Sequence, residues 1–280
     1  MVALLGSIRG WVRWVVLALL PPIKKLVEEK NALAAQLGPT RAGSTNCGDG
    51  IFLRGKNIRF GEEKRFQQAY AVGMGSGHKL DKNIDLRWRV HVALWAASHA
   101  MHRPGDFAEC GVSTGIMSLA ICDYFDFKNT NKSFYLFDTF EGIPLEQAEP
   151  DELNHVKELN ESSYYDSYEL AKKNFSPYPN ALLVKGRIPE SLQTVKIDQV
   201  GYVHIDLNVA KPERDALEFF WPKLVSGGVI LLDDYGFEGY EAQHESANAF
   251  VEKLNATETY RENKVMMLAL PTGQGLIIKP

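Results

Sequence analysis

The chain has 280 residues, which is long enough to bury a full-sized hydrophobic core. With 45% hydrophobic and 24% charged residues, it has the composition of an ordinary globular protein, which excludes a disordered or low-complexity chain. The formal net charge of -4 argues against a nucleic-acid partner, because proteins that bind nucleic acid usually carry a basic patch.

The N-terminal segment is strongly apolar. Residues 11–20 contain one charged residue, Arg13, and two prolines follow them. A helix needs about 20 apolar residues to cross a bilayer, so this segment is too short to span one, and it lacks the basic start of a signal peptide. We interpret residues 1–50 as a helical extension and linker, with the linker over 38–50. We favour a contact between subunits of a homo-oligomer over a membrane contact.

Two further features bear on location and partners. Cys47, Cys110 and Cys122 cannot all pair, and none lies in a Cys-x-x-Cys motif, which favours a reducing cytoplasm over a disulfide framework or a zinc knuckle. The basic cluster at residues 87–89 is interpreted as a solvated helix face.

Residues 51–280 are expected to form one α/β domain. Apolar residues recur at helical spacing over 85–101, and short apolar runs then alternate with helical patterns. The expected strands cover 107–112, 133–137, 181–185, 202–207 and 229–232, and the later helices cover 116–125 and 212–225. Apolar strands separated by helices indicate a parallel sheet covered on both faces, and residues 265–270 and 275–279 add an antiparallel hairpin. The prediction is a Rossmann-like, mostly parallel seven-stranded sheet.

A glycine turn follows the first expected strand. Glu109 lies near the end of that strand, and Gly111 and Gly115 allow the backbone to turn tightly and approach a ligand. Ser113 or Thr114 can cap the next helix, whose N-terminal N–H groups favour an anion. The turn is not Gly-x-Gly-x-x-Gly, so the dinucleotide fingerprint is absent.

An acidic residue follows the second expected strand. Asp138, with Thr139 beside it, stands where an acid can accept hydrogen bonds from ribose hydroxyls. A simple helix cap at Asp138 is the alternative. The turn and the acid together indicate an adenosine-bearing ligand, and they leave NAD and S-adenosylmethionine both open.

Three more aspartates follow two other strands. Asp206 ends the strand at 202–207, and Asp233 and Asp234 end the strand at 229–232. Neighbouring strands lie about 4.8 Å apart, so these carboxylates can converge. Converging carboxylates repel one another unless a cation offsets them, and oxygen ligands without cysteine indicate Mg²⁺ or another divalent cation that prefers oxygen. The alternative is that they cap a helix or turn.

Taken together, these motifs resemble the macrocin O-methyltransferase (TylF-like) family of class I S-adenosylmethionine-dependent methyltransferases, whose sheets also end in an antiparallel hairpin. The resemblance covers about residues 85–260. It rests on the motifs at 109–112, 137–144, 186–192, 204–206 and 227–236.

The resemblance implies an O-methyltransferase that acts on a sugar or another small polyhydroxylated molecule. It implies S-adenosylmethionine near Glu109, Gly111 and Asp138, and Mg²⁺ at Asp206, Asp233 and Asp234. Residues 140–168 would form a lid over the acceptor, with Tyr164 and Tyr165 as candidate contacts.

One position departs from the family pattern. The strand-four motif of metal-dependent members reads Asp-x-Asp, and its second Asp is a candidate general base, but position 208 is an asparagine with no basic carboxylate. Asp206, Asn208 and His204 are therefore the candidate catalytic residues. The cation alone could activate the hydroxyl, or His204 or His244 could replace the base, or the acceptor could differ.

Two other functions stay open. A nicotinamide-dependent oxidoreductase is disfavoured because the third glycine and a Tyr-x-x-x-Lys pair are absent. A methyltransferase-like protein with lost or altered activity is motivated by Asn208.

Overall fold

The computed structural model describes residues 25, 45–79 and 84–280. The chain divides into two compact units, one of residues 48–51 and 58–280 and the other of residues 1–47 and 52–57. The sheet and the cavity described below belong to the larger unit. The apolar segment at 11–20 lies outside the described residues, and the predicted domain boundary after residue 50 stays a prediction.

The described elements alternate between strands and helices, as the apolar pattern predicts. The strands are β1 (Thr45–Gly48), β2 (Ile51–Arg54), β3 (Asp106–Cys110), β4 (Phe134–Asp138), β5 (Ala181–Lys185), β6 (Val200–Ile205), β7 (Leu224–Leu232), β8 (Leu268–Ala269) and β9 (Gly275–Ile278). The helices are α2 (Lys64–Met74), α3 (Arg87–Met101), α4 (Ile116–Tyr124), α5 (Leu153–Ser162), α6 (Tyr168–Phe175), α7 (Ala210–Phe220) and α8 (Glu241–Asn255). Short 3-10 helices cover Arg59–Glu62, Phe127–Asn129, Leu145–Gln147, Glu190–Gln193 and Glu258–Tyr260.

Seven strands form the main sheet in the order β5-β4-β3-β6-β7-β9-β8. The first five are parallel, and β9 pairs antiparallel with both β7 and β8. The chain runs outward from β3 to β5 and then crosses to β6, so the direction of strand order reverses between β3 and β6. Ligands in open α/β sheets bind beyond the carboxyl ends of the strands at such a point. The predicted fold class is confirmed.

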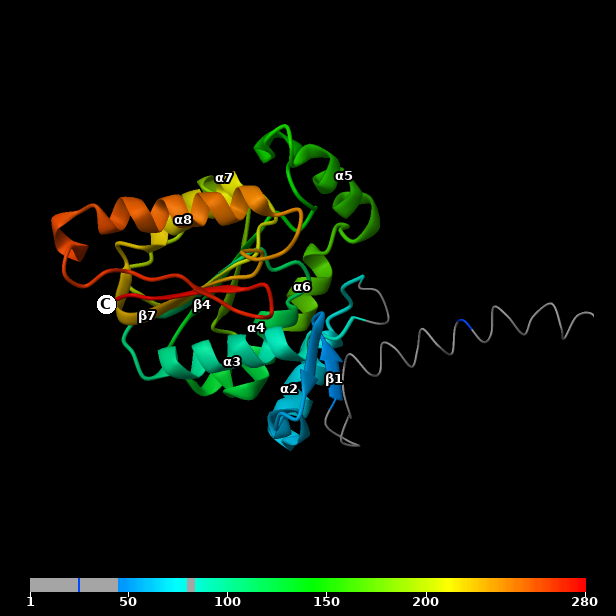
Figure 1. Cartoon of the computed structure of the whole chain (residues 1–280). Helices are drawn as coiled ribbons and strands as arrows, with labels where there is room; N and C mark the ends of the chain where they lie inside the picture. The colour runs from blue at the N-terminus through cyan, green and yellow to red at the C-terminus, as the bar shows by residue number, and fades with distance from the viewer. Residues whose placement is uncertain (1–24, 26–44, 80–83) are drawn as a thin grey trace, which may run out of the picture. The chain divides into compact units, whose positions relative to one another are not determined.

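Helices cover both faces of this sheet (Figure 1). Because side chains alternate along a strand, β3 places Phe107 in the apolar cluster with α2, α3 and α4, and Ala108 in the cluster with α7 and α8. Helix α3 contributes Val90 and α4 contributes Leu119 to the first cluster. Burial on both faces is why the parallel strands read as continuous apolar runs.

Part of the predicted linker was wrong, since β1 and β2 pair as a hairpin. Asp49 and Gly50 form its turn with φ values of 51° and 68°. An Asp-Gly pair with positive φ at both positions is the favoured two-residue hairpin turn, a signal that the linker interpretation overlooked.

The predicted ends of three other elements also shift. Helix α7 begins at Ala210, β7 begins at Leu224, and β8 covers only Leu268–Ala269. Strand β8 starts late because the backbone N–H of Val265 donates to the Asn255 side chain instead of to a neighbouring strand.

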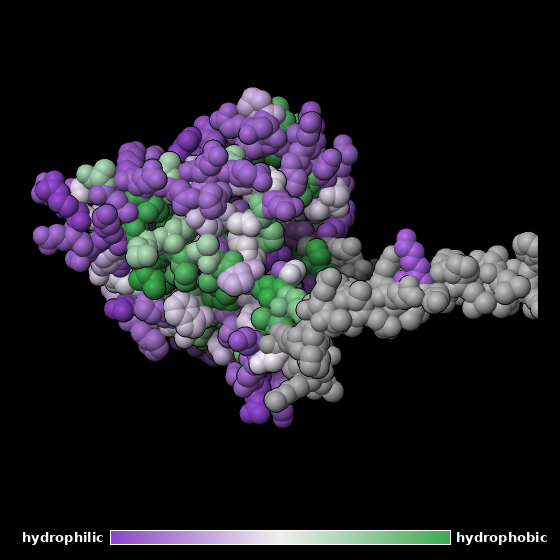
Figure 2. All heavy atoms as spheres, viewed as in Figure 1, coloured by the Kyte–Doolittle hydropathy of each residue, from purple (hydrophilic) through white to green (hydrophobic). Residues whose placement is uncertain are grey.

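Apolar side chains gather around the C-terminal hairpin on the face shown in Figure 2. Met266 and Leu268 are 78% and 55% exposed, and Ile278 is also exposed. No helix within residues 45–79 and 84–280 is long and apolar enough to cross a membrane.

Candidate functional site

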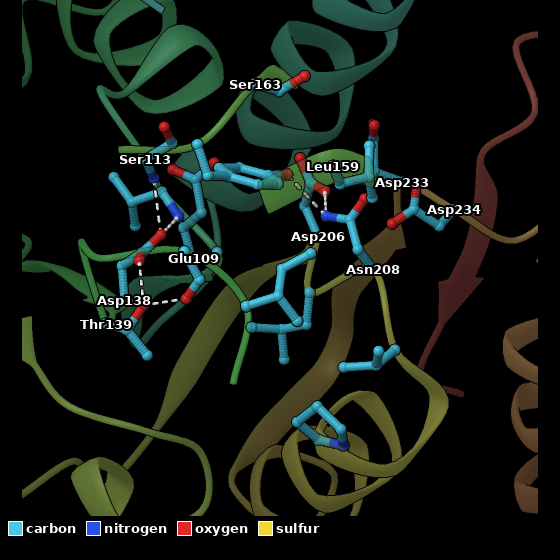
Figure 3. Close-up of a pocket in the computed structure, with 18 of the residues that line it drawn as sticks. Glu109, Ser113, Asp138, Thr139, Leu159, Ser163, Asp206, Asn208, Asp233 and Asp234 are labelled. Carbon is cyan, nitrogen blue, oxygen red and sulfur yellow. Dashed lines mark hydrogen bonds between the residues drawn. The ribbon is translucent and has the colours of Figure 1, made fainter. Parts of the chain in front are cut away.

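A cavity of about 350 Å³ opens where the strand order reverses. Its walls come from the carboxyl ends of β3, β4, β6 and β7 and from the segment after β4. Most of the predicted site residues line it, namely Glu109, Gly111, Ser113, Asp138, Thr139, Asp206, Asn208, Asp233 and Asp234. Gly115 and His204 are not among the lining residues. The structure therefore brings the cofactor residues and the acidic residues to one cavity (Figure 3).

The glycine turn is fixed by close packing. Gly111 has a φ of 89°, and a Cβ atom there would lie 1.7 Å from the carbonyl oxygen of Asp206. Gly115 has a φ of 99°, and its Cβ would overlap the ring of Phe175. These overlaps require glycine at both positions whether or not a ligand is bound.

The capping expectation for this turn was wrong. Gly115 is the N-cap residue of α4, and no side chain of the described residues caps the helix. The hydroxyl of Thr114 instead pairs with that of Ser76 at 2.8 Å. Ser113 lines the cavity with a positive φ of 49°.

Asp138 holds the backbone of the glycine turn. Its Oδ2 accepts from the N–H groups of Val112 and Ser113 at 2.6 and 2.7 Å, and its Oδ1 accepts from the N–H of Phe140 at 2.5 Å. The hydroxyl of Thr139 lies 3.4 Å from the same Oδ1. A carboxylate offers about four acceptor positions, so one is left for a ribose hydroxyl when Thr139 donates elsewhere. Thr139 lies beside it and donates to the carbonyl of Gly142 at 2.6 Å.

The acidic residues converge as the strand ends predict. Asp206, Asp233 and Asp234 each place a carboxylate oxygen within 4.8 Å of the others. Burial and then repulsion by Asp233 raise the pKa of Asp206 well above its usual value. Burial, then repulsion by Glu213 and Asp233, does the same to the pKa of Asp234. These two carboxylates therefore favour a nearby cation.

Asp233 differs from the other two aspartates. Its Oδ2 lies 2.8 Å from Nη1 of Arg89, and its Oδ1 accepts from Nε2 of Gln274 at 2.9 Å. Burial would raise the pKa of Asp233, but the Arg89 charge and His204 outweigh it and hold this pKa below its usual range. Asp233 is therefore ionised and already paired within the protein.

His204 lies between two carboxylates. Its Nδ1 is 2.9 Å from Oε1 of Glu109, and its Nε2 is 3.6 Å from Oδ1 of Asp233. Burial would lower the pKa of His204, but Asp233 and Glu109 outweigh it and raise this pKa well above its usual value. These contacts favour the protonated imidazole, and the role of His204 as a base stays a prediction. His244 is not among the cavity-lining residues, and its Nδ1 is 3.0 Å from the carbonyl oxygen of Tyr235.

Asn208 bridges three side chains. Its Nδ2 donates to the hydroxyl of Tyr164 at 3.0 Å and to Asp206 at 3.3 Å, while its Oδ1 accepts from the hydroxyl of Tyr240 at 3.0 Å. Its φ of 60° is a conformation that asparagine tolerates. An amide can donate and accept at once, which explains why an asparagine can bond to all three side chains. Among the catalytic candidates, Asp206 is the one that presents a carboxylate to the cavity.

Part of the cavity wall comes from the segment expected to form a lid. Ile143, Pro144, Leu159 and Tyr164 line the cavity, and Tyr164 follows the end of α5. Burial, followed by the charge of Asp206, raises the pKa of Tyr164 well above its usual value, so this phenol stays protonated. Tyr165 is not a lining residue, because its hydroxyl donates to the carbonyl of Gly77 at 2.6 Å.

Sequence reasoning missed several residues at the site. Arg89 was interpreted as part of a solvated face, yet its side chain is only 20% exposed and lines the cavity. Tyr240 and Gln274 reach the site from the segment before α8 and from the C-terminal hairpin. Glu213 is 4% exposed, and its charge contributes to raising the pKa of Asp234. No local pattern marked these residues, because long-range folding brings them to the site.

Three buried carboxylate oxygens have no hydrogen-bond partner among the described residues, Oε2 of Glu109, Oε1 of Glu213 and Oδ2 of Asp234. Of these residues, Glu109 and Asp234 line the cavity. An unpaired buried carboxylate oxygen is costly, so each position fits a positively charged ligand group. The oxygen-only donor set around Asp234 suits Mg²⁺ or Mn²⁺.

A protein-family model described as Macrocin-O-methyltransferase (TylF) matches residues 92–262. Among curated relatives, the 8-demethyl-8-(2,3-dimethoxy-alpha-L-rhamnosyl)-tetracenomycin-C 4'-O-methyltransferase of Streptomyces olivaceus is 25% identical over 142 residues, which are 48% of this chain and 54% of that protein. The Mycinamicin III 3''-O-methyltransferase of Micromonospora griseorubida is 25% identical over 156 residues, 51% of this chain and 60% of that protein. The chain thus spans little more than half the length of these relatives.

The fold is also similar to a solved structure. The O-methyltransferase NovP superposes with a TM-score of 0.62 and 15% sequence identity, covering 76% of this chain and 97% of NovP. At this identity the likeness shows the fold alone.

Proposed function

Because this chain belongs to the macrocin O-methyltransferase (TylF) family, we propose that it is an O-methyltransferase that uses S-adenosylmethionine and a divalent cation, Mg²⁺ first. The acceptor is a hydroxyl of a sugar or another small polyhydroxylated molecule. The observation that carries the proposal is the convergence of the glycine turn, Asp138 and three aspartates on one cavity. The curated relatives support the acceptor class, since one is named for a rhamnosyl compound.

The methyl donor fits the β3 and β4 side of the cavity. S-adenosylmethionine would supply a methyl group bound to a positively charged sulfur. A bond from the acceptor oxygen to the methyl carbon would form in line as the carbon–sulfur bond breaks, with S-adenosylhomocysteine as the leaving group. Asp138 has one acceptor position left for a ribose hydroxyl when Thr139 donates to Gly142. Oε2 of Glu109 has no partner among the described residues and can receive a cationic group. Because Gly111 has no side chain, the turn lets S-adenosylmethionine approach the backbone closely.

The acceptor fits the side of the acidic residues. A divalent cation at Asp206 and Asp234, with Asp233 beside them, would orient the acceptor hydroxyl and lower its pKa. Tyr164 and Asn208 close the cavity over this position, and the protonated tyrosine is a hydrogen-bond donor to a polyhydroxylated molecule. Holding both reactants in one orientation is the main help that a protein gives to an in-line displacement.

A methyltransferase-like protein with altered activity is the second candidate. Asn208 favours it, because an amide has no basic lone pair for the proton of the acceptor. Tight binding of S-adenosylmethionine combined with slow methylation across a wide acceptor panel would support this second function.

The binding test separates the proposed function from an oxidoreductase. S-adenosylhomocysteine is expected to bind in isothermal titration calorimetry, and NAD is expected not to bind. Radiolabelled S-adenosylmethionine with Mg²⁺ and a panel of glycosides then tests transfer to a hydroxyl. Binding of NAD alone would contradict the proposal.

We expect Asp138→Asn to weaken the binding of S-adenosylhomocysteine by about 10- to 100-fold, the usual cost of losing a charge-assisted hydrogen bond. Both carboxylate oxygens of Asp138 accept hydrogen bonds from backbone N–H groups. The amide nitrogen of an asparagine cannot accept such a bond. Calorimetric titration measures the change. Asp198→Asn, at a side chain that is 78% exposed, is the control and should bind as the wild type does. Equal affinities for the two variants would remove Asp138 from the cofactor site.

The remaining expectations concern partners and location. The unpaired buried Cys110 and Cys122 agree with a cytoplasmic protein. A homo-oligomer is supported by the exposed apolar side chains around the C-terminal hairpin.

A further inference from the structure

Arg89 is a positively charged residue inside the acidic cluster. Its Nη1 lies 2.8 Å from Oδ2 of Asp233, and its guanidinium carbon lies 5.3 Å from the ring centre of Phe237. The side chain lines the same cavity as Asp206 and Asp234. Because an arginine keeps its charge at any working pH, the acidic cluster always contains one cation of the protein itself.

Asp49 fixes the position of this guanidinium. Its Oδ1 lies 2.8 Å from Nε of Arg89, and its Oδ2 accepts from the backbone N–H groups of Trp88 and Arg89 at 3.1 and 3.0 Å. The Asp49 side chain is fully buried. The turn of the β1–β2 hairpin therefore holds both the first turn of α3 and the arginine side chain that α3 carries.

The three aspartates divide into two kinds as a result. Both oxygens of Asp233 face groups of the protein, Arg89 on one side and Gln274 with His204 on the other. Asp234 is 6% exposed, and its Oδ2 has no hydrogen-bond partner within the described ranges. A ligand of positive charge therefore finds its unsatisfied oxygen at Asp234, with Asp206 beside it.

We propose that Arg89 is the permanent counterion of Asp233. Asp206 and Asp234 are then the carboxylates that hold the divalent cation, and the charge of Arg89 limits the affinity of the site for that cation. Asp49 is the positioning residue that holds Arg89 in this place. The inference rests on the proposed cation site.

The charge argument gives the direction of the effect. Removing a positive charge a few ångströms from a divalent cation strengthens the binding of that cation, even when the protein screens the interaction strongly. We expect Arg89→Met to bind Mn²⁺ at least about tenfold more tightly than the wild type. The control is Arg87→Met, because Arg87 also pairs with an aspartate, Asp85, and does not line the cavity.

The test uses the full-length protein without acceptor, and free Mn²⁺ is measured by electron paramagnetic resonance. Circular dichroism checks that each variant is folded. Arg87→Met should bind Mn²⁺ within about twofold of the wild type. Mn²⁺ binding by Arg89→Met that is equal to or weaker than the wild type overturns the inference.

A charge-balanced double variant decides the role of Asp233 and does not depend on the single variant being stable. Arg89→Met with Asp233→Asn keeps the net charge of the cluster, so Mn²⁺ should bind within about threefold of the wild type. A loss as large as that of Asp234→Asn would make Asp233 a direct ligand and overturn the inference. If the wild type itself binds no Mn²⁺, the proposed cation site fails, and the inference fails with it.

Discussion

Asp234→Ala is expected to lower methyl transfer by at least about a hundredfold, while S-adenosylhomocysteine binds with nearly unchanged affinity. Asp234 supplies a buried oxygen that has no partner among the described residues, so its removal takes away a group that favours a cation at the acceptor position. The donor side of the cavity, around Asp138, does not depend on it. Turnover with saturating Mg²⁺ and calorimetry with S-adenosylhomocysteine measure the two effects.

The thermal stability of an Asp234 variant distinguishes a role in cation binding from a structural role. Burial and neighbouring carboxylates raise the pKa of Asp234, which means that the folded protein disfavours its charged form at neutral pH. Without added metal, Asp234→Asn should therefore melt at a higher temperature than the wild type, although it is inactive. Asp123→Ala, at a half-buried aspartate paired with Arg65, is the control and should keep full turnover. Unchanged turnover in Asp234→Ala would refute the metal role.

Gly111→Ala is expected to destabilise the domain by about 2–5 kcal/mol. A positive φ costs a non-glycine residue about 1–2 kcal/mol, and relieving the overlap with the Asp206 carbonyl requires a backbone shift that costs about 1–3 kcal/mol more. For a domain of this size the melting temperature would fall by about 10 °C, which thermal unfolding by circular dichroism detects. The same shift displaces Asp206 and the turn, so transfer should fall with stability.

Gly239→Ala is the matched control. Gly239 has a φ of 90°, close to the 89° of Gly111, but no atom lies within 4 Å of a Cβ built there. This variant therefore has only the conformational cost of about 1–2 kcal/mol. Equal melting temperatures for the two variants would mean that contact with Asp206 does not restrict position 111.

The strands of the sheet could be predicted from the sequence because each one is marked by a local run of apolar residues. The central strands β3 and β6 are buried almost throughout, and the expected strand at 181–185 matches the edge strand β5 residue for residue. The carboxyl ends of parallel strands meet at one edge, which is why the sequence alone groups Asp206, Asp233 and Asp234. The TylF resemblance is confirmed by the match over residues 92–262.

The contacts of the site were less predictable, because they depend on residues far apart in the sequence. Arg89 lies 144 positions from Asp233, and nothing near residue 89 indicates which face of α3 meets the cavity. Asn208 was recognised as a missing base, but its bonds to Tyr164 and Tyr240 depend on two loops whose paths have no periodic pattern. The assigned roles of the site residues stay predictions.

The Asn208 bridge sets a condition on how molecules enter and leave. Tyr164 and Tyr240 come from separate segments, and one amide holds both hydroxyls over the acidic side of the cavity. If either segment moves away alone, a buried polar group loses its partner, which costs about 1–3 kcal/mol. Exchange of acceptor for product is therefore easiest when both segments move together, so a substitution in either loop should change the rate of product release.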